Sequence, residues 1–302
     1  MPTRRSVLVA FSALALGGCS APAPSGSASP VAASAAPVAD DAAADTAVDV
    51  VTTPPTVPAH ASPTPPRPTL EQVQARFGGR APKTWGLDVP GVATRSGAGT
   101  VALTFDACGG TGGNGVDGWL ISALRKNKVP ATLFLNARWI AANPGTSAEL
   151  AADPLFELAD HGTAHRPLSV NGRSAYGIAG TASLAAVYEE LVSNRAHLEA
   201  LVPKPGRWYR PGTAYYDEVS AEVTRAVGLV PVNFSVNGDG GATFSASQVV
   251  TAVGAVGPGD IVISHMNRPG SGTAPGYEAV LPRLLDRGVT FATLSKAGLA
   301  LA

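Results

Sequence analysis

The chain has 302 residues and carries as many Lys and Arg residues (22) as Asp and Glu residues (22), so its formal net charge is zero. This length accommodates one sizeable domain with appendages, or two small domains. The lack of a basic excess argues against nucleic acid as a partner, because phosphate neutralisation requires positive charge. With only two cysteines there is no disulfide framework, and no structural disulfide is expected.

Residues 1–19 have the pattern of an export signal. Arg4 and Arg5 precede an apolar run that is shorter than the about 20 residues needed to cross a bilayer. The four residues that end at Cys19, Leu-Gly-Gly-Cys, resemble the lipobox of bacterial lipoproteins, in which the cysteine is lipidated. The resemblance implies an exported chain, anchored through Cys19 to the outer face of the cytoplasmic membrane in the cell envelope. A secreted protein with a cleaved signal is the alternative, and the twin-arginine and general export routes both remain open.

Residues 20–69 are predicted to be a disordered linker. They are almost wholly Ala, Pro, Ser, Thr, Val and Asp, and show neither a helical nor an alternating period. Such a composition cannot bury enough surface to offset the entropy of the chain. The prolines favour extended conformations at about 3 Å per residue, so the linker could lift a domain on the order of 100 Å from its anchor.

A single globular domain is predicted over residues 70–302, where short apolar runs alternate with helical patterns. Helices are expected at residues 70–77, 116–126, 147–152, 154–160, 184–201, 217–227, 247–255 and 277–287. Strands are expected at residues 101–105, 131–135, 207–209, 230–236, 260–264 and 289–294. The longest helix has a plausible apolar stripe formed by Leu184, Val187, Leu191, Ala196 and Leu198.

This alternation favours parallel strands joined by helical crossovers. Polar residues follow directly after several different strands, namely Asp106, Arg210, Asn237 with Asp239, and His265. Active sites of (β/α) barrels are built in this way at the carboxyl ends of the strands, so a barrel is preferred to an open sheet. The glycine-rich residues 109–113 lack the spacing of a dinucleotide fingerprint.

His161 and His165 stand four residues apart. On a helix they would share one face with Cβ atoms about 5–6 Å apart, and two neutral imidazoles at that separation can chelate a divalent ion such as zinc. Each polar residue also has an ordinary interpretation: Asp106 as a cap, Arg210 as the partner of a surface acid, His265 as a satisfied histidine at a strand end. Their occurrence together, in this order, favours an active site.

The motifs resemble those of the polysaccharide deacetylase family (the NodB homology domain, carbohydrate esterase family four). They are Thr104-Phe105-Asp106, His161-x-x-x-His165, Arg210-Pro211-Gly212, residues 235–239 and Ile263-Ser264-His265. The resemblance covers residues 98–298 and implies a distorted (β/α) barrel of about seven parallel strands. It also implies a metal-dependent hydrolase that removes N-acetyl or O-acetyl groups from a cell-wall or extracellular polysaccharide, peptidoglycan or chitin-like.

Carried over residue by residue, the resemblance gives each motif a role. Asp106 is the general base, Arg210 orients it, His265 is the general acid, and Asp239 tunes that histidine. His161 and His165 bind a divalent metal ion, with zinc expected and cobalt as a second possibility. Trp208 and Tyr215, which flank Arg210, are predicted to stack on sugar rings.

One position departs from the family pattern. The sequence reads Thr-Phe-Asp-Ala-Cys, which puts Ala107 where the family has a second, metal-binding aspartate. Cys108 is a possible third ligand, because a thiolate suits zinc; Asp106 itself and Asp117 are the other possibilities. Alternatively, Cys108 is a small buried residue that packs in the core and binds no metal ion. An active deacetylase is therefore the first hypothesis, a catalytically impaired glycan-binding protein the alternative, and another metal hydrolase the third.

Overall fold

The structure, a computed structural model, describes residues 66–97 and 99–299. The predicted signal peptide, Cys19 and most of the predicted linker lie outside the described residues. Helix α1 (Leu70–Phe77) begins where the globular pattern begins, and Thr69 caps it. Across the described residues, no helix combines the length and the apolar character that a membrane crossing requires.

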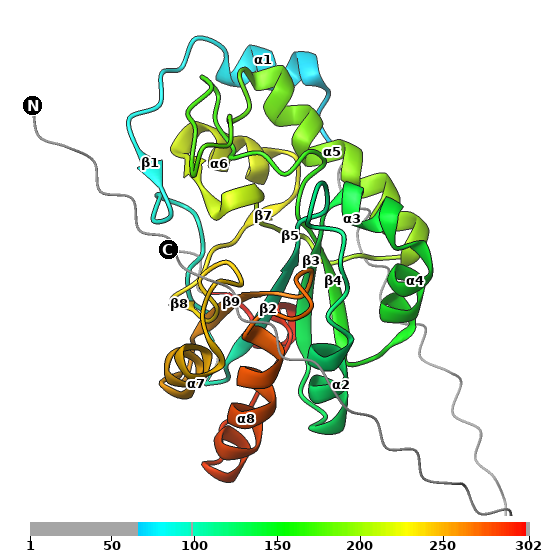
Figure 1. The fold of residues 1–302 in the computed structure, drawn as a ribbon. Helices are drawn as coiled ribbons and strands as arrows, with labels where there is room; N and C mark the ends of the chain where they lie inside the picture. Colours follow the sequence, from blue (N-terminus) through cyan, green and yellow to red (C-terminus); the bar gives the residue numbers. More distant parts are fainter. Residues whose placement is uncertain (1–65, 98, 300–302) are drawn as a thin grey trace, which may run out of the picture. The chain divides into compact units, whose positions relative to one another are not determined.

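Seven strands form one parallel, curled sheet, as predicted for the fold (Figure 1). Their order across the sheet is β7 (Val230–Pro231), β5 (Trp208–Tyr209), β4 (Phe156–Asp160), β3 (Ala131–Leu135), β2 (Ala102–Ala107), β9 (Ile261–His265) and β8 (Val236–Asn237). The two outermost strands are consecutive in sequence. Residues 232–235 join them, bonding first to β5 through the Val232 amide and then to β9 through the Ser235 amide (2.9 and 3.0 Å). The chain therefore passes directly from one edge of the curled sheet to the other, and these two amides extend the pairing of each edge strand with its inner neighbour.

The register aligns the chemically important strand ends. Asp106 of β2 is the direct partner of His265 of β9, and Leu135 of β3 is the partner of Asp160, the last residue of β4. Because parallel strands point the same way, their polar carboxyl ends meet at one end of the barrel. This is the arrangement on which the prediction of an active site depended.

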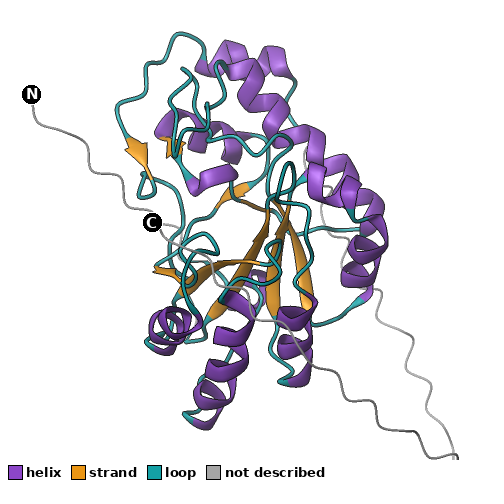
Figure 2. Cartoon of the chain, in the orientation of Figure 1, coloured by secondary structure: helices purple, strands orange, loops and turns teal. Residues whose placement is uncertain are grey.

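Helices surround the strands (Figure 2). One group is formed by α1, α5 (Leu184–Leu201) and α6 (Glu218–Ala226), and another by α2 (Gly118–Lys126), α7 (Ala246–Gly254) and α8 (Thr273–Asp286). The short helices α3 (Ala137–Ala142) and α4 (Pro144–Ala152) pack near α5, and α9 (Leu294–Ala297) comes last. A separate two-stranded sheet pairs β1 (Trp85–Gly86) with β6 (Tyr216–Asp217).

Strand alternation decides which side chains of β2 reach the site. Leu103, Phe105 and Ala107 belong to the large core cluster shared with the outer helices, whereas Ala102 packs with Phe134 in a second cluster inside the barrel. Successive side chains of a strand point to opposite faces. Asp106 therefore points into the barrel, and the Ala107 methyl group is sealed in the outer core with no exposed surface.

One helical prediction was wrong. Residues 154–160 were expected to be a helix, but Phe156–Asp160 is strand β4, because pairing with β3 and β5 outweighs the helical preference of Glu, Leu and Ala. The residues between His161 and His165 form a loop rather than a helical turn. Helix α3, capped by the Asn136 side chain, was not predicted.

Three other details also differ from the sequence predictions. Residues 230–236 were expected to be one strand, but they form β7, a connection and β8, on opposite edges of the sheet. Residues 289–294 were expected to be a strand, but they contribute one isolated bridge, Val101 to Phe291, before α9. On α5 the apolar stripe is buried at Val187, Leu191 and Leu198, whereas Ala196 is exposed.

Candidate active site

Asp106 and Arg210 form a buried ion pair at the floor of the site. The Asp106 carboxylate Oδ1 accepts a 2.8 Å hydrogen bond from Arg210 Nη1, and the two side chains are 3% and 0% exposed. Arg210 also donates to the Thr104 hydroxyl and to the Asn233 carbonyl, and its guanidinium lies 4.3 Å from the centroid of the Phe134 ring. So many partners fix the guanidinium, and it in turn fixes one oxygen of Asp106.

The other Asp106 oxygen faces a group of possible metal ligands. Its Oδ2 lies 3.7 Å from His161 Nε2. The ligand atoms of Cys108, His161 and His165 all lie within 4.8 Å of one another. The Cys108 Sγ to His161 Nε2 separation is 3.7 Å, close to the about 3.5 Å that separates two atoms bound to zinc at about 2.3 Å (sulfur) and about 2.0 Å (nitrogen). This donor set fits a zinc-type ion.

Backbone geometry orients both imidazoles. His161 Nδ1 lies 2.8 Å from the Arg210 carbonyl, which can only accept, so Nδ1 carries the proton and Nε2 is free to ligate. The loop then turns through Gly162 (φ 74°) and ends with His165 itself in the left-handed region (φ 58°). His165 packs so closely on Gly212 that a Cβ there would lie 2.2 Å from the His165 carbonyl oxygen. The Arg-Pro-Gly motif therefore makes room for the second histidine.

Sequence reasoning missed a set of buried polar residues that hold this loop. Glu190 of α5, 3% exposed, accepts hydrogen bonds from the amides of Ala164 (2.9 and 3.0 Å) and Arg166 (3.2 Å). The Asn136 amide donates to the carbonyls of His161 and Gly162 (2.9 and 2.7 Å). The loop is thus held from both of its sides.

Asp160 and Asn194 complete the support beneath His161. Asp160 Oδ1 accepts from the Gly162 amide (2.9 Å) and from Asn194 Nδ2 (2.8 Å). Burial raises the pKa of Asp160 from 3.8 to about 6. Glu190 and Asn194 lie on the same face of α5 as the apolar Val187, Leu191 and Leu198. Polar residues on an apolar stripe were the signal that could have identified them.

His265 stands on the other side of Asp106, on the neighbouring strand, and Asp239 holds it. Its Nδ1 lies 3.0 Å from Asp239 Oδ1, and its backbone amide donates to Asp239 Oδ2 (2.7 Å). The Thr273 hydroxyl donates to the same Oδ2 (3.0 Å). Asp239 is fully buried, so the imidazole is fixed by a carboxylate that cannot turn away.

The buried charges shift the protonation states of these groups. Burial alone would raise the pKa of Asp106, but the nearby charges of Arg210, His161 and His265 lower it below its usual value. Burial alone would lower the pKa of His265, but the hydrogen bond to Asp239 and the neighbouring Cys108 raise it well above the usual value. A carboxylate that stays ionised therefore faces an imidazole that stays protonated.

The pKa of the Cys108 thiol is lowered, as is that of Asp106. Burial alone would raise the pKa of Cys108, but the charge of His165, together with hydrogen bonds to His161, His165 and His265, lowers it well below the usual value. The thiolate is the form that ligates metal ions. Asp117, the other possible ligand, is instead the cap of α2, where its Oδ1 accepts from the Leu120 amide (3.2 Å).

The two predicted sugar-stacking residues lie in different places. Tyr215 is half-buried in an aromatic cluster, with its ring centroid 5.6 Å from that of Trp85 and 5.4 Å from that of Tyr176. Trp208 points into the barrel, where its indole N–H donates to Glu157, the second residue of β4 (2.9 Å). Trp208 therefore lies towards the opposite end of the strands from Asp106.

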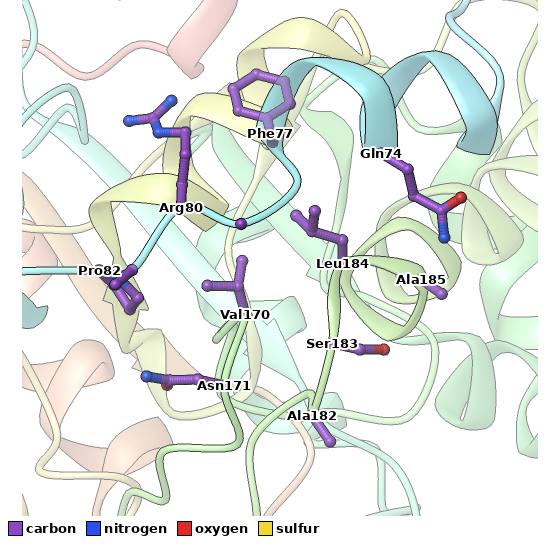
Figure 3. Close-up of a pocket in the computed structure, with 12 residues that line it drawn as sticks. Gln74, Phe77, Arg80, Pro82, Val170, Asn171, Ala182, Ser183, Leu184 and Ala185 are labelled. Atoms are coloured by element: carbon purple, nitrogen blue, oxygen red, sulfur yellow. The ribbon is translucent and has the colours of Figure 1, made fainter.

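A cavity of about 580 Å³ lies away from this site, between the end of α1 and the start of α5. Figure 3 shows Phe77, Val170 and Leu184 facing it, with Arg80 at one side. Arg80 is already paired with Glu222 (2.7 Å). None of the candidate catalytic or metal-binding residues lines this cavity. The candidate active site is therefore identified by the arrangement and chemistry of its side chains and not by the volume of a cavity.

Residues 93–232 match the family model described as polysaccharide deacetylase. No curated protein sequence matches the chain. The match ends before Asp239 and His265, so the placement of these two residues comes from the structure.

Solved structures show where this fold occurs. The Bc1960 peptidoglycan N-acetylglucosamine deacetylase is 20% identical, with a TM-score of 0.57 over 69% of this chain and 93% of its own. A family 4 carbohydrate esterase from Streptomyces lividans is 23% identical, with a TM-score of 0.54 over 68% of this chain and 97% of its own. BA3943, a pseudoenzyme of the same family from Bacillus anthracis, is 19% identical, with a TM-score of 0.54 over 68% and 67%. The fold is that of the family 4 carbohydrate esterases, and residues 93–232 resemble polysaccharide deacetylases.

Proposed function

We propose that this chain is a metal-dependent polysaccharide deacetylase of the carbohydrate esterase family 4 type. One observation carries the proposal: an ionised Asp106, fixed by Arg210, stands between a Cys-His-His group and the Asp239–His265 pair. Acyl hydrolysis requires a base for water, an electrophile for the carbonyl and an acid for the leaving group. These three groups meet at one end of the barrel.

Asp106 is the general base. Its carboxylate stays ionised because the charges of Arg210 and His265 keep its pKa low. Arg210 holds Oδ1, so Oδ2 remains directed towards the side where His161 lies. Asp106 therefore accepts the proton of the attacking water at Oδ2.

His265 is the general acid. Its raised pKa keeps the imidazole protonated at neutral pH, and Asp239 occupies Nδ1, which leaves the Nε2 proton for the departing group. An amine leaves readily only when protonated, so this proton transfer is needed for an acetamide substrate. The products are acetate and a free amino sugar, or a free hydroxyl if the substrate is an O-acetyl ester.

His161, His165 and Cys108 would hold the metal ion, zinc or cobalt. When bound, such an ion polarises the acetyl carbonyl and lowers the pKa of a water molecule. Cys108 would supply the ligand that Ala107 cannot, because the Ala107 side chain belongs to the outer core. A thiolate one residue later thus replaces the family's carboxylate.

Ala107 also favours a second candidate, a glycan-binding protein without turnover. If Cys108 does not ligate, two histidines alone would hold a metal ion weakly. The remaining residues of the site would then bind the glycan without hydrolysing it.

The test is acetate release by the purified chain from N-acetylglucosamine oligomers, peptidoglycan and acetylxylan, with added zinc or cobalt and again after chelation. The proposal expects metal-dependent release that Asp106→Ala abolishes. Zinc titration against a coloured chelator, with Cys108→Ser beside wild type, tests the third ligand. No release from any polymer, with glycan binding retained, would support the second candidate.

The envelope location forms a further part of the proposal. The pattern before Cys19 supports export and lipid anchoring at the outer face of the cytoplasmic membrane, with peptidoglycan or a chitin-like glycan as substrate. Incorporation of a labelled fatty acid into the wild-type chain, but not into Cys19→Ala, is the expected result. Release of the unlabelled wild-type chain into the medium would favour the secreted alternative.

A further inference from the structure

Four exposed arginines surround the mouth of the site, and we call them the rim arginines. Arg138 lies on α3 after β3, Arg166 and Arg173 lie on the loop after β4, and Arg268 follows β9. All four therefore stand on segments that leave the carboxyl ends of the strands, where Asp106 and His265 also lie.

No exposed carboxylate balances them on these segments. The loops and strand ends there contain Asp106, Asp117, Asp160, Asp217 and Asp239, and each of these is at most 2% exposed. The whole chain is neutral, with 22 basic and 22 acidic residues. At the opposite end of the barrel the charges are mixed, since Glu157, Lys204 and Arg207 line one cavity. Positive charge thus predominates on the segments that follow these strands.

Two of the rim arginines are held in place without a charged partner. Arg138 Nη2 donates to the Cys108 carbonyl (3.1 Å), which sets its guanidinium directly beside the proposed metal group. The Arg173 guanidinium lies 5.3 Å from the centroid of the Trp85 ring. In the described part of the chain, none of the rim arginines forms an ion pair with an acidic side chain. Such guanidinium groups remain available for an external anion.

Aromatic rings adjoin Arg173 and suit a sugar. Tyr215 packs between Trp85 and Tyr176, and Tyr176 is 74% exposed. Flat rings present an apolar surface to the face of a pyranose, while a planar guanidinium recognises a carboxylate with two parallel hydrogen bonds. Together they match a sugar that carries a carboxylate.

We infer that the substrate of this site is an acetylated polysaccharide whose repeat carries carboxylate groups, and that the rim arginines recognise those groups. Arg173, with Trp85, Tyr176 and Tyr215, forms the subsite for an acidic sugar along the chain from the one that is deacetylated. This inference deepens the proposed function and rests on it.

Equilibrium binding to the full chain tests the inference. The probes are a hyaluronan octasaccharide, which is N-acetylated and carries carboxylates, and the same octasaccharide with its carboxyl groups reduced to alcohols. The measurement is made after chelation, so that turnover is suppressed and failure of the deacetylase proposal would not obscure the result. We expect the carboxylated probe to bind at least about tenfold more tightly, and increasingly so as salt falls from about 200 to about 50 mM.

Arg173→Gln and Arg268→Gln should each weaken binding of the carboxylated probe by about 2–5-fold and leave the reduced probe unaffected. Arg207→Gln, an exposed arginine at the opposite end of the strands, is the matched control and should change neither. Equal affinities for the two probes would overturn the inference. So would a loss in Arg207→Gln as large as in the rim variants, because it would indicate attraction to overall charge.

Discussion

The floor of the site and its rim are held together in different ways. On the floor, Arg210 is fully buried and bonded to three partners, and Asp106 is bonded to Arg210. On the rim, Arg173 is exposed and lies on one ring. Removing one partner of a buried ion pair leaves an uncompensated charge, whereas exposed charge pairs contribute little. Changes on the floor should therefore affect both folding and chemistry, and changes on the rim only substrate choice.

Asp106→Asn is expected to have the largest effect. It removes the base and strands the Arg210 charge, so acetate release should fall by at least about 10³-fold, and the free energy of unfolding by about 3–5 kcal/mol. Adding Arg210→Met removes the stranded charge and should restore part of the stability without activity. Denaturant unfolding and acetate release, measured on both variants, separate the two effects. A single variant as stable as wild type would show that the ion pair does not stabilise the floor.

Glu190→Gln should have the next largest effect, because it acts on the metal loop without touching the metal group. Weaker bonds to the Ala164 and Arg166 amides should loosen His165 and lower zinc affinity by about 10–100-fold. Glu189→Gln is the matched control, since its carboxylate accepts only from the Ser193 hydroxyl among the described residues. If both variants titrate zinc like wild type, the α5 carboxylate does not position the loop.

Asp160 should produce a pH dependence of stability. Its folded pKa, about 6, lies above its usual 3.8, so the folded state binds the proton more tightly than the unfolded state. Stability should therefore fall as pH rises from about 4 to about 6, by up to about 3 kcal/mol at about 1.4 kcal/mol per pKa unit.

Asp160→Asn keeps the Oδ1 that accepts from Gly162 and should remove this fall, so that the variant is more stable than wild type above pH 6. Denaturant unfolding of chelated protein across this pH range is the measurement. Parallel profiles for the two proteins would mean that Asp160 does not titrate there.

The smallest effect is expected at the aromatic residues. Tyr215→Ala should raise KM for a polymeric substrate by about 3–10-fold and leave kcat unchanged, because an aromatic stacking contact contributes about 0.5–1.5 kcal/mol. Trp208→Phe should leave KM unchanged, since the Trp208 indole bonds to Glu157 inside the barrel. An equal rise in KM for Trp208→Phe would contradict this prediction, because it would indicate substrate contacts at the end of the strands opposite Asp106.

The sequence predicted what local patterns determine. Strand β3 and helices α1 and α5 begin and end where their apolar patterns do, and the seven-stranded parallel fold is confirmed. Strand β4 and the paired segments β7 and β8 were missed, because their states depend on neighbours that are distant in sequence. Helical preference could not reveal that Glu157 would sit between Thr132 and Trp208.

The site shows the same division. Motif spacing selected Asp106, His161, Arg210 and His265, and the structure brings them together. Motif spacing could not specify that the histidine pair lies on a loop, although Gly162 between the two histidines and Pro167 shortly after them are typical of a loop. Nor could it specify Glu190, whose role depends on the contact between α5 and that loop.

The bridge between β7 and β8 also bears on solubility at high concentration. Both outer strands have only two residues, and the connecting residues 232–235 bond to the strands on either side of the gap. A long, flat edge strand exposes unpaired N–H and C=O groups, with which a strand of another molecule can pair, and this pairing leads to aggregation. Here the described sheet offers no such long template, because each of its two outer strands has only two residues.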